Sequence, residues 1–234
     1  MSAKNFLIVG GSKGIGLELT TRLAGQGNTV LVLSRTSDHL ADLENVTHLP
    51  FDATVDEVES SALPETIDGL VYCPGSINLR SFRSLKPEVF RVDFELNVVG
   101  AIKVLQAAMP ALKKAPGSSV VLFSTVAVGL GMHAHASIAA SKGAIEGLTR
   151  TLAAELSPAT RVNCIAPALT QTPLTERFFA DPEKAKSLAD MYPLQRTGVP
   201  ADLAAVAEFL LSSESTWITG QILHVDGGMS SVKN

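Results

Sequence analysis

The chain has 234 residues, a net charge of −4 and a sequence pI of about 5.7, so it lacks the basic excess that nucleic-acid binding requires. Hydrophobic residues make up 46% and charged residues 18%, which excludes a disordered chain and is typical of a compact globule. Two cysteines, Cys73 and Cys164, are too few for a disulfide framework, and their apolar surroundings predict small core residues. Because the sequence has no signal-peptide pattern and no apolar run of membrane-spanning length, we expect a soluble cytoplasmic protein.

Seven short apolar runs are predicted to be β-strands, at residues 6–9, 29–33, 46–50, 69–72, 119–123, 161–165 and 221–225. Most are continuous rather than alternating, as expected for strands that are buried on both faces. Longer segments with helical periodicity separate them, which predicts βαβ units. The fold class is therefore α/β, a doubly wound sheet of about seven parallel strands with helices on both faces.

The helices are predicted at residues 15–24, 90–114, 135–156 and 200–211. Since no repeat, low-complexity tract or linker divides the chain, residues 1–234 are expected to form one domain. The stretch from Leu174 to Tyr192 is the least regular. We expect it to be part of a substrate flap at about residues 170–195.

A glycine-rich turn, Gly10-Gly-Ser-Lys-Gly14-Ile-Gly16, joins the first strand to the first helix. Glycines permit a tight turn and close approach of a pyrophosphate, and the helix N-terminus offers free N–H groups to the phosphates. The spacing G-x-x-x-G-x-G is a variant of the usual fingerprint, and a purely structural turn is the alternative interpretation. Its position at the first βα crossover favours a dinucleotide-binding site in a Rossmann-type domain.

The charges near this turn bear on the choice of dinucleotide. Sites that prefer NAD often have an acidic residue at the end of the second strand, but here Ser34 and Arg35 stand there, with Lys13 in the turn. A pair of cations can hold a 2′-phosphate. The sequence therefore favours NADP(H), with NAD(H) as the alternative cofactor. The other explanation of Lys13 and Arg35 is that both are solvated charges of the protein surface.

From Phe6 to Gly228 the sequence resembles the short-chain dehydrogenase/reductase family, in particular its 3-oxoacyl-(acyl-carrier-protein)-reductase-like branch. Besides the glycine turn, the matching motifs are Asp52-Ala53, Asn97-Val-Val-Gly100, Ser141-Lys142-Gly-Ala, Arg161-Val-Asn-Cys-Ile-Ala-Pro167, Trp217-Ile-Thr-Gly-Gln and Val225-Asp-Gly-Gly228. Three motifs depart from the family pattern: Val9 replaces a threonine, Tyr72-Cys-Pro-Gly75 replaces Asn-Asn-Ala-Gly, and Pro167-Ala168 replaces Pro-Gly.

The resemblance implies roles for individual residues. Asn97, Thr125 and Lys142 occupy positions of the family's catalytic asparagine, serine and lysine. Together with the glycine-turn and charge arguments, it predicts cofactor contacts at Gly10, Ser12, Lys13, Gly14, Ile15, Gly16, Ser34, Arg35, Asp52, Ala53, Gly75, Asn97, Lys142, Pro167 and Thr172.

The family's catalytic tyrosine is missing. The tyrosine stands four residues before the lysine, one helical turn away, and here that position is Ile138, which cannot donate a proton. His135 lies seven residues before Lys142, two turns away, which is where the family's enoyl-reductase branch has its tyrosine. Our hypothesis is that His135, together with Ser137, supplies the acid. The alternative is that Ser137 caps the helix and that His133 and His135 are polar groups of the surface or the cleft.

The sequence thus predicts an NADP(H)-dependent oxidoreductase acting on a small carbonyl or alcohol with an atypical proton donor. The alternative is a catalytically weak or inactive dinucleotide-binding sensor or partner subunit. We expect no metal, because His133 and His135 would not share a helix face. Tyr72 and Tyr192 are predicted packing residues, Tyr192 with an exposed hydroxyl. The alternative for Tyr192, which follows the irregular stretch, is that it reaches a substrate. The resemblance implies a homotetramer or homodimer formed through the long helices, with no nucleic-acid or membrane partner.

Overall fold

The computed structural model describes residues 3–233, which form a seven-stranded parallel sheet with the strand order β3-β2-β1-β4-β5-β6-β7. The strands are β1 (Asn5–Val9), β2 (Thr29–Ser34), β3 (Val46–Pro50), β4 (Gly69–Tyr72), β5 (Ser118–Phe123), β6 (Thr160–Pro167) and β7 (Ile222–Val225). All six strand pairs are parallel. The predicted doubly wound α/β fold is confirmed, and every predicted strand is present with bounds shifted by at most two residues.

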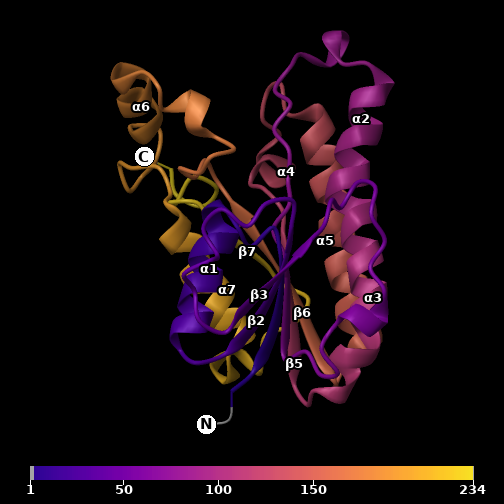
Figure 1. The fold of residues 1–234 in the computed structure, drawn as a ribbon. Coiled ribbons are helices and arrows are strands. Elements are labelled where there is room, and N and C mark those ends of the chain that lie inside the picture. Colours follow the sequence, from indigo (N-terminus) through magenta and orange to yellow (C-terminus); the bar gives the residue numbers. More distant parts are fainter. Residues whose placement is uncertain (1–2, 234) are drawn as a thin grey trace.

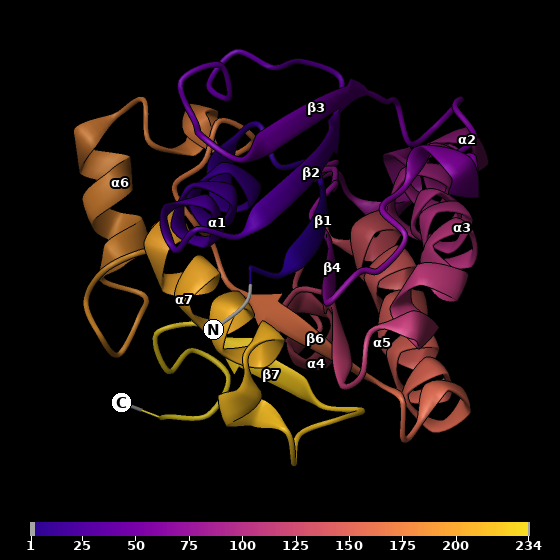
Figure 2. The ribbon, with the colours of Figure 1, turned by 60° about the horizontal axis from the view of Figure 1, so that its bottom comes forward.

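Helices cover both faces of the sheet (Figure 1). One face carries α1 (Gly14–Gly25) and α7 (Pro200–Leu211), which pack against each other. The other face carries α2 (Pro87–Phe94), α3 (Gly100–Lys114) and α5 (Ala136–Leu156). Figure 2 shows the sheet between these two layers, with β3 at one edge and β7 near the other.

The two faces of β1 show why continuous apolar runs form the central strands. Leu7 and Val9 belong to the core beneath α3 and α5, whereas Phe6 and Ile8 belong to the core beneath α1 and α7. Because neighbouring side chains of a strand point to opposite faces, a strand between two helical layers must be apolar at every position.

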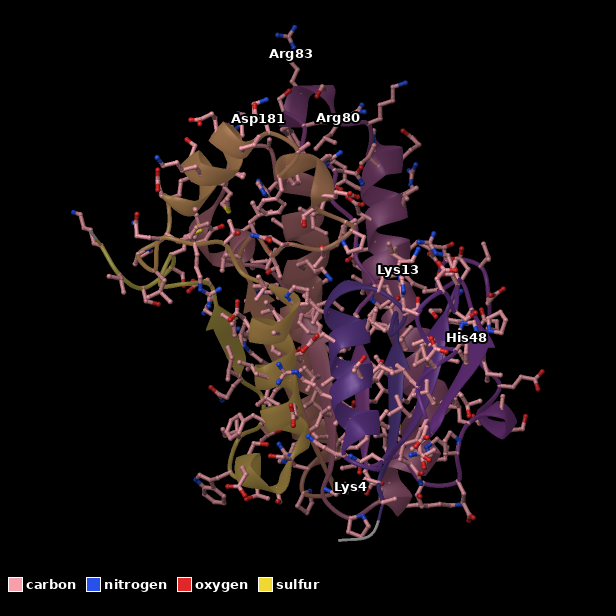
Figure 3. All side chains as sticks on the ribbon, turned by 60° about the vertical axis from the view of Figure 1, so that its left-hand side comes forward. Lys4, Lys13, His48, Arg80, Arg83 and Asp181 are labelled. Atoms are coloured by element: carbon pink, nitrogen blue, oxygen red, sulfur yellow. The ribbon has the colours of Figure 1, made fainter. Side chains whose placement is uncertain are left out.

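The strand order reverses direction at β1, since β2 lies on one side of it and β4 on the other. In open α/β sheets such a reversal opens a crevice at the carboxyl ends of the strands. Lys4 and Lys13 flank β1 and lie toward opposite ends of the sheet in Figure 3, so Lys13 marks the carboxyl edge.

The helix predicted at residues 90–114 begins earlier and is not uniform. It consists of α2, a π-helical turn η3 (Glu95–Val99) and α3 in direct succession. Asn97 lies in this π turn, an element that is frequent at functional sites. Apolar periodicity cannot reveal one inserted residue in a long helix, so the sequence predicted an unbroken α-helix.

The stretch predicted to be irregular contains more structure than expected. It holds a 3₁₀ turn η4 (Glu176–Phe178) and a two-turn helix α6 (Pro182–Ala189) that has no buried residue. Asp181 caps α6 by accepting hydrogen bonds from the N–H groups of Glu183 and Lys184, and Pro182 occupies the first turn. These start signals were overlooked because the segment has no long apolar stripe. In Figure 2, α6 lies outside α1 and α7, at the rim of the molecule.

Short elements fill the remaining connections: η1 (Ser60–Ala62), η2 (Phe82–Ser84), α4 (Ala127–Leu130) and η5 (Ser213–Ser215). Within residues 3–233, none of the helices combines the length and the apolar character needed to cross a bilayer.

Candidate active site

Two cavities meet along the carboxyl edge of the sheet. The first, of about 330 Å³, lies over the ends of β1, β2 and β3, and its walls include Gly10, Ser12, Lys13, Ser34, Arg35, Asp52 and Ala53. The second, of about 230 Å³, lies over the ends of β4, β5 and β6, and its walls include Ile15, Thr125, His135, Ile138, Lys142, Pro167 and Thr172. Cys73 and Gly75 line both. The structure thus brings most of the predicted site residues to one continuous cleft, whereas Gly14, Gly16 and Asn97 line neither cavity.

The backbone of the glycine turn requires glycine at three points. Gly10 and Gly14 have φ values of +75° and +54°, which side chains other than glycine rarely adopt. At Gly16 a β-carbon would lie 2.3 Å from the carbonyl oxygen of Gly10. Lys13 is the N-cap of α1 and makes no side-chain capping bond, so the first N–H groups of the helix face the cleft uncapped.

At the far end of the first cavity the charges are exposed. Lys13 pairs with Asp38 at 3.4 Å, with side chains 49% and 57% exposed. Arg35 is exposed as well, while Ser34 is buried and its hydroxyl donates to the carbonyl of Thr36. Hydrogen bonds from Thr54 hold the pKa of Asp52 below its usual value, with a smaller contribution from the charge of Arg35. The cations of this end are therefore exposed side chains with carboxylates nearby.

Asn97 is buried in η3, beside Gly75. Its amide nitrogen donates to the Ser76 hydroxyl at 3.0 Å and to the Asp93 carbonyl at 2.7 Å. Within residues 3–233, its Oδ1 has no hydrogen-bond partner. A β-carbon built on Gly75 would lie 3.6 Å from this oxygen and 3.7 Å from Lys142 Nζ. The side-chain-free space beside Gly75 therefore has a hydrogen-bond acceptor and a cation on its walls and suits a polar group of a ligand.

Lys142 lies on α5 with only 6% of its surface exposed. Burial lowers its pKa to about 8, against the opposing effects of Cys164, Cys73 and Asp93. The ammonium group is therefore still mostly protonated at neutral pH, but it can lose its proton in mildly alkaline solution.

Ile138 stands one helical turn before Lys142 and lines the same cavity with 6% of its surface exposed. Thr125 lines it too, and its hydroxyl accepts a hydrogen bond from the N–H of Ala127 at 3.3 Å, which leaves the hydroxyl proton for another acceptor. The neighbouring Ser124 instead donates its proton to Glu146 at 2.8 Å. Of these two hydroxyls, Thr125 is the one placed to donate into the cavity.

His135 is the N-cap of α5, and its ring lines the cavity. Its Nδ1 lies 2.7 Å from the carbonyl oxygen of His133, so Nδ1 carries a proton and Nε2 is left for a ligand. His133 is exposed. The predicted partnership with Ser137 is wrong, as is the alternative that Ser137 caps the helix. Its hydroxyl is buried inside the first turn and donates to the Asp93 carboxylate.

The two tyrosines differ. Tyr72 is a buried packing residue, as predicted, and its hydroxyl donates to the Leu96 carbonyl at 2.6 Å. Tyr192 is also buried, so the predicted exposed hydroxyl is wrong. That hydroxyl accepts a hydrogen bond from the N–H of Leu169 at 3.2 Å, and the side chain lines the second cavity. This position fits the alternative that Tyr192, at the end of the irregular stretch, reaches a substrate.

Further wall residues were not singled out from the sequence. Most of them are apolar and come from four separate segments: Ile77, Leu79, Met132, Leu169, Leu174 and Met229. Cys164 is buried as predicted, whereas Cys73 is half-buried at the cleft rather than in the core. Thr172 packs over the glycine turn, because a β-carbon on Gly14 would lie 3.3 Å from its side chain.

Comparisons with known proteins agree with this arrangement. Residues 9–230 match the family model described as Enoyl-(Acyl carrier protein) reductase. The 3-oxoacyl-(acyl-carrier-protein) reductase of Thermotoga maritima is 31% identical over 245 residues, which cover 98% of each chain. The L-xylulose reductase of Bos taurus is 31% identical over 240 residues, which cover 97% of each chain.

Among solved structures, the ligand-free aldohexose dehydrogenase of Thermoplasma acidophilum superposes with a TM-score of 0.89 at 26% identity, covering 99% of this chain and 97% of the other. A short-chain type dehydrogenase/reductase from Mycobacterium ulcerans superposes equally well, with a TM-score of 0.89 at 29% identity and coverage of 98% and 91%. The family uses nicotinamide dinucleotides. The chain therefore belongs to the short-chain dehydrogenase/reductase family and is an oxidoreductase of that type.

Proposed function

We propose that the protein is an NADP(H)-dependent oxidoreductase that acts on a small, largely apolar carbonyl or alcohol, with a proton donor other than tyrosine. The observation that carries this proposal is the continuity of the cleft. The cavity beside the glycine turn joins, at Gly75, the cavity lined by Lys142, Thr125 and His135. A dinucleotide and a substrate could therefore meet at that junction.

The residues of the first cavity fit a dinucleotide. The three constrained glycines and the uncapped start of α1 suit a pyrophosphate, and Lys13 and Arg35 offer positive charge to a 2′-phosphate. Asn97 Oδ1 and Lys142 Nζ, on either side of the space beside Gly75, suit the polar groups of the nicotinamide half. When bound, the reduced dinucleotide supplies the hydride that converts a carbonyl to an alcohol.

The substrate class follows from the walls of the second cavity. They are mainly aliphatic, and in the described chain Lys142 is the only lysine or arginine among them. Such a pocket favours an uncharged substrate that presents one polar group to the Thr125 hydroxyl. The segment at about residues 170–195 contributes Leu174, Thr175 and Tyr192, which supports its role as a substrate flap.

We assign the proton donor to His135. Its Nδ1 is engaged by the carbonyl of His133, so a protonated ring presents Nε2–H as the free donor. Thr125 orients the carbonyl oxygen, and the imidazolium proton passes to that oxygen as the alcohol forms. We also propose that the protein works in the cytoplasm as a homotetramer or homodimer, like other proteins of this fold with two long helices on one face of the sheet.

The test is to follow NADPH absorbance with a panel of uncharged aldehydes and ketones, as a function of pH, for the wild type and two histidine variants. We expect the His135→Ala variant to lose roughly 10²- to 10⁴-fold in turnover, as is typical when a general acid is removed. The exposed His133 is the matched control, and His133→Ala should keep wild-type turnover. Wild-type turnover in His135→Ala would exclude His135 as the donor.

A protein that binds NADPH without oxidising it in the presence of any carbonyl of the panel would instead be a dinucleotide sensor or partner subunit. Ile138 is the observation that favours this second candidate, because no hydroxyl replaces the family tyrosine at that position. An Ile138→Tyr variant that gains turnover would show that the catalytic geometry has survived around Lys142.

A further inference from the structure

A buried carboxylate lies behind the candidate site, outside the roles described so far. Asp93 on α2 is 0% exposed, and three side chains donate to its carboxylate. Ser76 and Asn78 donate to Oδ1 at 2.6 and 2.7 Å, and Ser137 donates to Oδ2. The carboxylate therefore accepts three hydrogen bonds inside the protein, which fix its orientation.

The groups around Asp93 come from all three segments that carry the nicotinamide side of the cleft. Ser76 directly follows Gly75, and Ser137 directly precedes Ile138 on the helix that carries Lys142. Asp93 itself stands one turn before Asn97, and its carbonyl accepts from the Asn97 amide. The carboxylate of Asp93 therefore links the loop after β4 to α5, and its backbone carbonyl holds the π turn.

The Ser76 hydroxyl, together with the Asp93 carbonyl, sets which way the Asn97 amide faces. This hydroxyl has a single proton, and it donates that proton to Asp93. Toward Asn97 it can then only accept, so Nδ2 must face Ser76 and Oδ1 must face the space beside Gly75. Without the carboxylate, Ser76 could donate to Asn97 instead, and only the Asp93 carbonyl would still favour this orientation of the amide.

The charge of Asp93 also acts on Lys142. Burial lowers the pKa of Lys142 to about 8, and three groups counteract it: Cys164 on β6, Cys73 after β4, and Asp93. Burial raises the pKa of both thiols to about 12, so they are neutral at the pH where Lys142 titrates. His135 lines the same cavity, and Glu146 on α5 is engaged by Ser124 and Arg150. Asp93 is then the anion that favours the charged ammonium.

We propose that Asp93 is a positioning residue of the active site, which orients the Asn97 amide through Ser76 and keeps Lys142 protonated for binding the nicotinamide half of the cofactor. This inference rests on the proposed cofactor, but its main test does not. In the protein without ligand, the ¹³Cε shift of Lys142 can be followed against pH in lysine-labelled protein. The signal is assigned by its loss in Lys142→Met.

The decisive variant is Asp93→Asn, which keeps the shape and most hydrogen bonds but removes the charge. We expect the midpoint of the Lys142 titration to fall by about one pH unit, because an opposite charge nearby has been removed. NADPH affinity at pH 8, measured by fluorescence titration, should fall about three- to tenfold with it. The control is Ser119→Ala, which removes another buried hydroxyl, one near the start of β5 that donates to the Leu210 carbonyl and lines neither cavity. It should leave both quantities at wild-type values.

An Asp93→Asn protein with the wild-type Lys142 midpoint would overturn the proposal. If that variant does not fold, Ser76→Ala provides the second test, because it retains the carboxylate while removing one of the two acceptors that orient the Asn97 amide. We expect an unchanged Lys142 midpoint and a three- to tenfold loss of NADPH affinity, and wild-type affinity would contradict the proposal. The two proposals can fail separately. If the wild type binds no NADPH, the proposed cofactor is refuted. If the Lys142 midpoint nevertheless falls in Asp93→Asn, the electrostatic role of Asp93 remains.

Discussion

The two ends of the cleft hold charge in opposite ways. At the β2 end, Lys13 and Asp38 are about half exposed, and Arg35 is exposed as well. At the β4–β5 end, Lys142 and Asp93 are 6% and 0% exposed. Exposed charges are screened by salt and contribute little to stability, whereas buried ones are costly but held in one position. The first end is thus suited to attracting an anionic ligand, and the second to placing individual atoms.

The largest expected effect concerns the backbone of the glycine turn between β1 and α1. A Gly16→Ala substitution would place a β-carbon 2.3 Å from the Gly10 carbonyl oxygen and push α1 away from β1. We expect a loss of at least 100-fold in NADPH affinity and a destabilisation of about 1–3 kcal/mol, as is typical of overpacking. Calorimetric titration measures the NADPH affinity, and chemical denaturation measures the free energy of unfolding.

Gly25 on the same helix is the matched control, because a β-carbon there would meet no atom within 4 Å. Gly25→Ala should bind NADPH like the wild type and gain up to about 1 kcal/mol of stability. Equal behaviour of the two variants would mean that close approach at the turn does not matter.

The second prediction separates function from stability at the buried end. The pKa of Lys142 is lowered from 10.5 to about 8 by burial, so its charged form destabilises the fold. The resulting loss in the free energy of unfolding is fully present below pH 8 and declines as the pH rises to 10.5. Between these values the folded chain has lost the Lys142 proton while the unfolded chain still holds it, so stability rises with pH. Lys142→Met should therefore raise the free energy of unfolding at pH 7 by about 2–3 kcal/mol.

The gain from Lys142→Met should shrink between pH 8 and 10.5, and NADPH affinity should fall in the same variant. Denaturant titrations of wild type and variant across this range give the difference curve. A variant less stable than the wild type at pH 7 would show that neighbouring groups stabilise the charge of Lys142. The buried charge would then not be costly, which contradicts the comparison of the two ends of the cleft.

The smallest effect is expected at the exposed end. Arg35→Ala should weaken NADPH about tenfold and NADH less than threefold, because only the first carries a 2′-phosphate. The NADPH penalty should diminish as salt is raised from 0.05 to 0.5 M, since the Debye length shortens. Arg91 on α2, paired with Glu88, is an exposed arginine outside both cavities and serves as the control. Equal losses for NADPH and NADH would argue against the proposed cofactor preference.

Much of the site could be anticipated because its signals are local. The glycine turn follows a strand within a few residues, and the spacing from His135 to Lys142 is two turns of one helix. The structure places both His135 and Lys142 on the wall of one cavity. The π turn at Asn97 and the helix α6 were not anticipated, since a single inserted residue and an eight-residue polar helix leave little apolar periodicity.

By itself, the sequence determined the order of strands and helices and the position of the glycine turn, and it has Ile138 four residues before Lys142. These follow from neighbouring residues, whose periodicity and backbone freedom act over one or two turns of chain. Only the tertiary structure decided that Asp93 meets Ser76 and Ser137, which are 17 and 44 residues away, and that Tyr192 lines the cavity. Such meetings depend on how α2 and α5 pack on the sheet, and the free energy of that packing comes from many residues that no single motif contains.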